Sequence, residues 1–366
     1  MTFRVLLLAA LGLTPGCSTF RSMGVGVTTP REVEELLPRA ESRLAAGDNE
    51  HALEDLRKVR EAEHLSNEEQ SRIDVLLERC AEARINELSA PGSDPEALEE
   101  LFDLNLPRQI AITAGVRAAR LWLDQDEPVD AYEMIQKVDR RYPPAGTHHE
   151  RQLAGDVLFE AGMKLAKSKF SILGLFSDRD DAQAILEYLV QNYPQERRCD
   201  QAYRQLARLY EHDRLWATAI ERHQDLVTYH LDSPLASESE WRIPHLRLVA
   251  LRRPDYDRRE LLRALAELDA WLEVHAGTEL EPRVVADRTD CLKRLAQSDL
   301  IVSHFYAHVE KWEGARIHAE RAVAVAERSG DAKTIAEARA ALALVPAAPA
   351  EKTGLGTATP ATGGPR

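Results

Sequence analysis

The sequence has few cysteines, few aromatic residues and no excess of positive charge. Its four cysteines, Cys17, Cys80, Cys199 and Cys291, are widely spaced and form no C-x-x-C pair, which disfavours a zinc site or a disulfide framework. The three after Cys17 are expected to act as small buried hydrophobes, with at most one bridge in an oxidising compartment. Lys plus Arg total 47 and Asp plus Glu total 61, so the formal net charge is −14. Nucleic-acid binding depends on excess Lys and Arg, so we expect none here.

The motifs of common catalytic sites are also missing. There is no Gly-rich phosphate loop, no G-x-S-x-G elbow and no Cys/His nucleophile arrangement. His304 and His308 are four residues apart and could share a metal, but they lack an H-E-x-x-H motif and an evident third ligand. We therefore expect no enzyme, no cofactor and no metal. A metal-dependent hydrolase built on these two histidines is the least favoured alternative.

Helical periodicity is what the sequence does contain. From Arg31 to Val345 apolar residues recur at helical spacing, with almost no strand signal, and Ala, Leu, Glu and Arg dominate. Turn signals such as Gly47-Asp48-Asn49 divide the pattern. We predict an all-α fold with helices over residues 31–46, 49–63, 67–88, 94–103, 107–124, 128–141, 148–168, 179–192, 197–212, 215–230, 235–252, 257–275, 281–309, 312–329 and 331–344.

The best-defined internal repeat begins at Asp200. Its first helix carries a stripe at spacing i, i+3, i+4 and i+7, made of Tyr203, Leu206, Ala207 and Tyr210. Its second helix carries Ala219 and Leu226, and Ala184 precedes Ala219 by 35 residues. This pattern resembles a tetratricopeptide repeat, in which small residues lie where two helices cross. The expected architecture is a tetratricopeptide-like α-solenoid of antiparallel helix pairs, with these residues in its core; the repeat count stays open.

The first 17 residues have the order of a targeting signal. Arg4 supplies a positive charge, Val5 to Leu13 is an apolar run too short to span a bilayer, and Gly16 stands before Cys17. This order resembles a bacterial lipoprotein signal, which implies that Cys17 is acylated and becomes the mature N-terminus. The alternative is an ordinary cleaved signal peptide with a coincidental cysteine. Ser18 after the cysteine favours the outer membrane, with the inner membrane as the alternative.

The domain organisation follows from these segments. Residues 1–17 are the expected signal and 18–30 a tether; 31–145 form an N-terminal helical-repeat region and 146–345 a second repeat domain. Residues 346–366 are Ala, Pro, Thr and Gly with almost no apolar bulk, so we expect a disordered tail.

A more specific resemblance covers the second repeat domain. The run DDAQAILEYLVQNYP (180–194) precedes the repeat at 199–227. Further along the chain come the long helix predicted over 281–309 and the helix predicted over 312–329. The matching positions in these later helices are Leu295-Ala296, Phe305-Tyr306, Trp312, Ala315 and Arg321. Together these segments resemble the BamD-type outer-membrane assembly lipoproteins.

That resemblance implies a lipid-anchored scaffold on the periplasmic face of the outer membrane, helping to insert β-barrel proteins. Protein or peptide partners are expected, including barrel-assembly machinery. The alternative is a generic tetratricopeptide envelope scaffold for secretion, secretin piloting or cell-wall machinery.

Two groups of residues are candidate binding sites. The first lies on the other face of the repeat's first helix, which tetratricopeptide geometry would turn to the concave surface, and consists of Gln201, Arg204, Arg208 and Glu211. Its two arginines are four residues apart and could clamp a carboxylate such as a peptide C-terminus. The alternative is a solvated face with local pairs to Glu211 or Asp200.

The second candidate is an apolar patch within residues 168–178. It consists of Phe170, Ile172, Leu173, Leu175 and Phe176. If exposed, it would contact a partner or membrane; if folded inward, it would cap the core.

Overall fold

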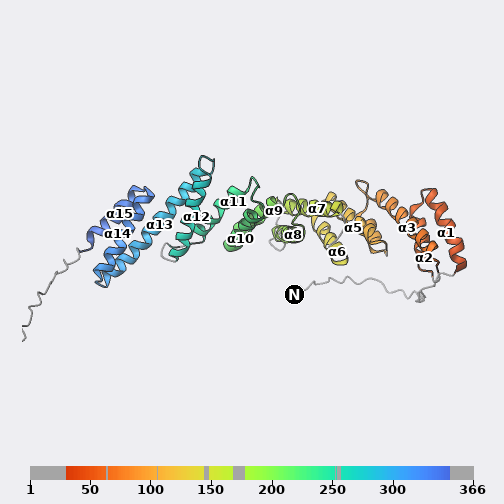
Figure 1. The fold of residues 1–366 in the computed structure, drawn as a ribbon, viewed down its shortest axis with the longest axis horizontal. Coiled ribbons are helices and arrows are strands. Elements are labelled where there is room, and N and C mark those ends of the chain that lie inside the picture. The colour runs from red at the N-terminus through yellow and green to blue at the C-terminus, as the bar shows by residue number, and fades with distance from the viewer. Residues whose placement is uncertain are drawn as a thin grey trace, which may run out of the picture. The chain divides into compact units, whose positions relative to one another are not determined.

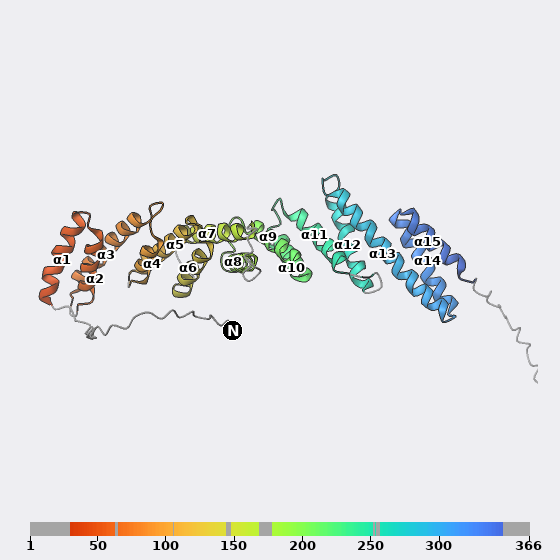
Figure 2. The same ribbon diagram turned by 180° about the vertical axis from the view of Figure 1, so that it is seen from behind.

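The computed structural model describes residues 30–62, 65–104, 106–143, 148–167, 178–251, 253 and 257–346. Within these ranges the chain forms fifteen α-helices and no strand (Figures 1 and 2). The all-α prediction is confirmed, and every helix begins and ends within three residues of its expected bounds. Cys17, the predicted apolar patch, whose residues all fall within 168–177, and the tail from residue 347 lie outside the described residues.

The chain divides into two compact units, Met1–Ala118 and Ala119–Arg366, and the boundary between them in sequence lies within α5 (Arg108–Asp124). The domain boundary expected at 145/146 came from the family resemblance rather than from packing, and it remains a prediction. The helices wholly within the first unit are α1 (Pro30–Ala45), α2 (Asn49–Arg60), α3 (Asn67–Leu88) and α4 (Pro95–Asp103).

Local sequence signals position these first helices. Ser66 and Glu69 form a reciprocal capping box that starts α3. Asp55 on α2 is almost fully buried and is held by Arg39 and Arg43 of α1, each at 2.6 Å. The ion pairs stabilise the α1–α2 contact because they neutralise a carboxylate that would otherwise be buried without a partner.

In the second unit, each helix from α6 to α14 packs on the helix that follows it in sequence. α7 also contacts α9, α11 contacts α13, and α13 contacts α15. Antiparallel pairs stacked in this way are the tetratricopeptide-like arrangement that the sequence predicts. These helices are α6 (Pro128–Arg141), α7 (His148–Lys167), α8 (Asp178–Asn192), α9 (Cys199–His212), α10 (Trp216–Tyr229), α11 (Ala236–Ala250), α12 (Arg258–Val274), α13 (Glu281–His308), α14 (Trp312–Ser329) and α15 (Ala332–Leu344).

Small residues allow close packing within the pairs. Ala207 of α9 and Ala219 of α10 are completely buried, as the repeat pattern predicts. Gly162 plays the same part on α7, because a Cβ atom there would lie 2.7 Å from Cγ of Leu186 on α8. The helices can approach at these points only because little or no side chain stands between them.

The three cysteines that the structure describes are free and buried. Burial raises the pKa of the Cys80 thiol to about 11 and those of Cys199 and Cys291 to about 12. Each thiol donates to a backbone carbonyl oxygen of a neighbouring segment. They are therefore weakly nucleophilic core residues, as expected.

Candidate functional site

The two arginines of the predicted binding quartet do converge on one carboxylate. Arg204 Nη2 lies 2.7 Å from Glu238 Oε2, and Arg208 Nη2 lies 3.7 Å from Glu238 Oε1. Glu238 belongs to α11 of the same chain, so an internal side chain occupies the clamp. Asp200 instead accepts a hydrogen bond from Ser233.

The remaining two members of the quartet differ in their surroundings. Gln201 is exposed, whereas Glu211 is largely buried beneath α11. Glu211 forms an ion pair with Arg242 of α11, whose Nε is 3.2 Å from Oε1. Arg204, Arg208 and Glu211 therefore join α9 to α11, a role that neither sequence-based alternative anticipated in this form.

His223 of α10 completes the polar cluster beneath the quartet. Its Nε2 lies 3.1 Å from Glu211 Oε1 and its Nδ1 lies 3.1 Å from Ser239 Oγ. A neutral imidazole satisfies both contacts when Nε2–H donates to Glu211 and Nδ1 accepts from the serine hydroxyl. Burial lowers the pKa of His223 to about 4, because the charged ring would lose its hydration.

The contacts continue from α11 to α13. Asp287 accepts hydrogen bonds from Trp241 Nε1 at 2.7 Å and from His245 Nδ1 at 2.9 Å. Burial works against the charge of Asp287, but these bonds and the nearby Arg242 hold its pKa below the usual range. Polar contacts therefore link α9 to α11 and α11 to α13.

The buried histidine predicts a pH dependence of stability. The unfolded chain takes up a proton at His223 below about pH 6.5, whereas the folded chain resists it down to about pH 4. Stability is therefore complete above about pH 6.5 and falls as the pH drops to 4, by up to about 3 kcal/mol from this residue. Urea unfolding of the wild type and of His223→Gln, measured from pH 7.5 to 4.5, checks this. The variant should lose less stability over that range; parallel curves would contradict the assignment.

A groove lies between α13 and α15, and five of the eight side chains that line it are apolar. Its volume is about 700 Å³. One wall is the stripe Gln297, Leu300, Ile301 and His304, and the other is the stripe Glu337, Ala340, Ala341 and Leu344. Ile301 is 45% exposed and Leu344 is 82% exposed. Both stripes follow i, i+3, i+4, i+7 spacing, so each helix turns one face into the groove.

Sequence reasoning missed this groove. It considered His304 only as a metal ligand, whereas the structure places that residue at one end of the α15-facing stripe. The signal was present in the spacing of Leu300 and Ile301, but that spacing is also typical of buried core. Only the packing of α13 against α15 distinguishes a stripe that lines a groove from one that is buried in the core.

Searches for metal and membrane sites gave no candidates within the described ranges. No group of three or more His, Cys, Asp or Glu side chains there could hold a metal ion. No helix among the described residues is both long and apolar enough to cross a bilayer.

No family model and no curated protein matches the sequence. Among solved structures, the tetratricopeptide domain of P58(IPK) is similar over 86% of this chain and 80% of that chain, with 14% identity and a TM-score of 0.23. The tetratricopeptide-like class therefore rests on the helix pairs described above. Stacked helix pairs of this kind present extended surfaces that such proteins use for binding.

Proposed function

We propose that this protein is a lipid-anchored envelope scaffold whose α13–α15 groove binds an amphipathic helix of a partner protein. The observation that carries the proposal is the pair of matched stripes that lines this groove. A partner helix with an apolar i, i+3, i+4, i+7 stripe would contact both walls, as one more helix in the stack.

The exposed apolar groups of the groove support this occupant. Ile301 and Leu344 face solvent beside the small side chains Ala340 and Ala341, so a partner can approach closely. Covering this surface would remove apolar area from water. Glu337 at one end favours a basic residue at the matching end of the partner helix.

The cellular setting of the proposal comes from the sequence. Acylation of Cys17 would hold the helical units at a membrane surface, and Ser18 favours the outer membrane. The resemblance of the second repeat domain to BamD-type lipoproteins makes β-barrel assembly the leading role. A scaffold for secretion, secretin piloting or cell-wall machinery is the second candidate.

The test places a photoreactive amino acid at Ile301 in the full chain, in cells that naturally make it. The matched control position is Ala324, which is exposed on α14 and does not line the groove. We expect a crosslink from Ile301 to an amphipathic helix of one partner and none from Ala324. Adding Ala340→Arg should reduce the crosslink by about tenfold, because it puts a charge into an apolar contact.

The identity of the crosslinked partner decides the role. A barrel-assembly protein would support the leading candidate, and a secretion or cell-wall protein would support the second. Equal crosslinking from Ile301 and Ala324, or no effect of Ala340→Arg, would contradict the groove as the binding site.

A further inference from the structure

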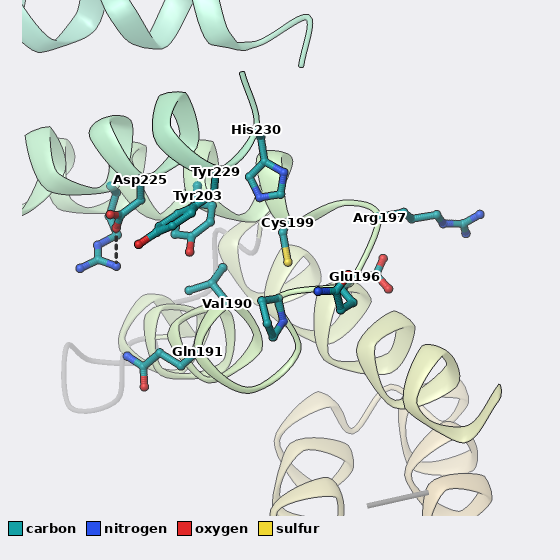
Figure 3. A pocket seen from close by; sticks show the side chains of 12 residues that line it. Val190, Gln191, Glu196, Arg197, Cys199, Tyr203, Asp225, Tyr229 and His230 are labelled. Atoms are coloured by element: carbon teal, nitrogen blue, oxygen red, sulfur yellow. Dashed lines mark ion pairs between the residues drawn. The ribbon is translucent and has the colours of Figure 1, made fainter. Parts of the chain in front are cut away.

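A second cavity lies away from the α13–α15 groove, where the end of α8, the start of α9 and the end of α10 meet (Figure 3). Its volume is about 720 Å³. Val190 and Gln191 come from α8, Tyr203 from the first turns of α9, and Tyr229 from the last turn of α10. The α8–α9 turn, with Glu196 and Arg197, closes the other end.

Aromatic rings form one end of this cavity. The centroids of Tyr203 and Tyr229 are 6.5 Å apart, and the His230 ring is 5.9 Å from that of Tyr203. Tyr229 is 68% exposed, although a tyrosine ring gains from being covered. Ring faces of this kind attract cations, since the π-electron density above them is negative.

Carboxylates lie beside the same rings. Asp225 forms an ion pair with Arg222 at 3.0 Å, and that guanidinium is also 3.6 Å from Glu187. The single positive charge of Arg222 thus lies between two carboxylates, Asp225 and Glu187. The aromatic end is therefore acidic. Burial raises the pKa of Asp225, Arg222 opposes the rise, and Glu187 and Glu221 add to it, as expected of a site short of positive charge.

The other arginine that lines the cavity does not neutralise the negative charge at the aromatic end. Arg197 is 77% exposed on its side chain and lies 3.6 Å from Asp156 of α7. Figure 3 shows it at the opposite end from Tyr203, Tyr229 and Asp225. Asp225 therefore shares Arg222 with Glu187, and a cationic side chain from outside the cavity would add positive charge at the aromatic end.

We propose that this cavity is a second binding site, which takes an arginine or lysine side chain of a partner polypeptide between Asp225 and the exposed ring of Tyr229, which stacks on the buried Tyr203. The aliphatic stem of such a side chain would lie along Val190 and Pro194, and its charged head would reach the carboxylate. The site does not depend on the α13–α15 groove, so either can fail alone.

The probe is a fluorescein-labelled peptide of glycine and serine with two adjacent arginines. A second peptide carries lysines in place of the arginines. The matched controls carry citrullines, which are neutral and of the same shape as arginine, or glutamates. Each is titrated into the detergent-solubilised full chain at low salt, and fluorescence anisotropy is measured. We expect the arginine and lysine peptides to bind about tenfold or more tighter than the citrulline peptide.

Variants with matched controls locate the binding. Tyr229→Ala should weaken binding of the arginine peptide by about fivefold. Its control is Leu231→Ala, because Leu231 is 67% exposed two residues away and does not line the cavity. Asp225→Asn should weaken binding by about tenfold. Its control, Asp232→Asn, makes the same charge change on an exposed residue outside the cavity.

Three results would overturn the proposal. The first is equal binding of the arginine and citrulline peptides. The second is equal weakening by each variant and its control, which would indicate general attraction to an acidic chain. The third is tightest binding of the glutamate peptide, which would assign the cavity to Arg222 and Arg197 as an anion site.

Discussion

Replacing Asp299 by alanine should lower the free energy of unfolding by about 3 kcal/mol, because the change leaves Arg258 and His318 without their shared partner. Asp299 lies on α13 and its side chain is 1% exposed. Arg258 of α12 is 2.9 Å from Oδ2, and His318 of α14 is 3.0 Å from Oδ1. One carboxylate therefore joins three consecutive helices.

The size of this effect depends on how far the partners can reach water. The side chains of Arg258 and His318 are 29% and 22% exposed, so solvent partly replaces the lost contact. That places the expected loss at the lower end of the usual range for a broken buried pair.

The matched control is Asp290→Ala on the same helix. Asp290 is 47% exposed and pairs with Arg294 at 2.7 Å within α13, so its loss should cost less than about 1 kcal/mol. Urea unfolding followed by circular dichroism measures both variants. Equal losses in the free energy of unfolding for the two variants would show that Asp299 does not hold α12, α13 and α14 together.

Replacing Gly162 by valine should cost about 2 to 3 kcal/mol, since there is no room for a side chain between α7 and α8. The Cβ atom would meet both Cγ and Cδ2 of Leu186 at 2.7 Å, and Leu186 is itself completely buried. The alanine variant should also fail to give the stabilisation of about 1 kcal/mol that alanine normally brings within a helix.

Two further variants separate the clash from other effects. Ala166→Val makes a β-branched change at a half-buried position of the same helix and should cost much less. Leu186→Ala removes the obstructing atoms, so the double variant Gly162→Val/Leu186→Ala should be more stable than the sum of the two single losses predicts. Simple additivity would contradict the close approach at Gly162.

Helix positions were predictable because their signals are local. Apolar spacing gives each helix, and turn residues such as Gly47 and Gly330 mark where one ends; both take positive φ in the structure. The inter-helix role of Ala207 and Ala219 was predictable for a related reason, since the repeat pattern links them over a short distance in sequence.

The partners of the candidate site were not predictable in this way. The spacing of Arg204 and Arg208 indicates that they act together, and they do. Their shared partner Glu238 lies one helix pair further along the chain, among 61 acidic residues that local spacing cannot rank. The α13–α15 groove is hidden for the same reason, because α14 separates its walls in sequence.

The nearest-neighbour packing of α6 to α15 has a consequence for how the chain reaches its folded state. Each of these helices makes its main contacts with helices one or two places away in sequence, so few long loops must close before packing begins. An early helix pair can form its core while later ones are still being delivered, and each new pair adds to an existing template. Such a chain can assemble in order from one end, whichever machinery supplies it.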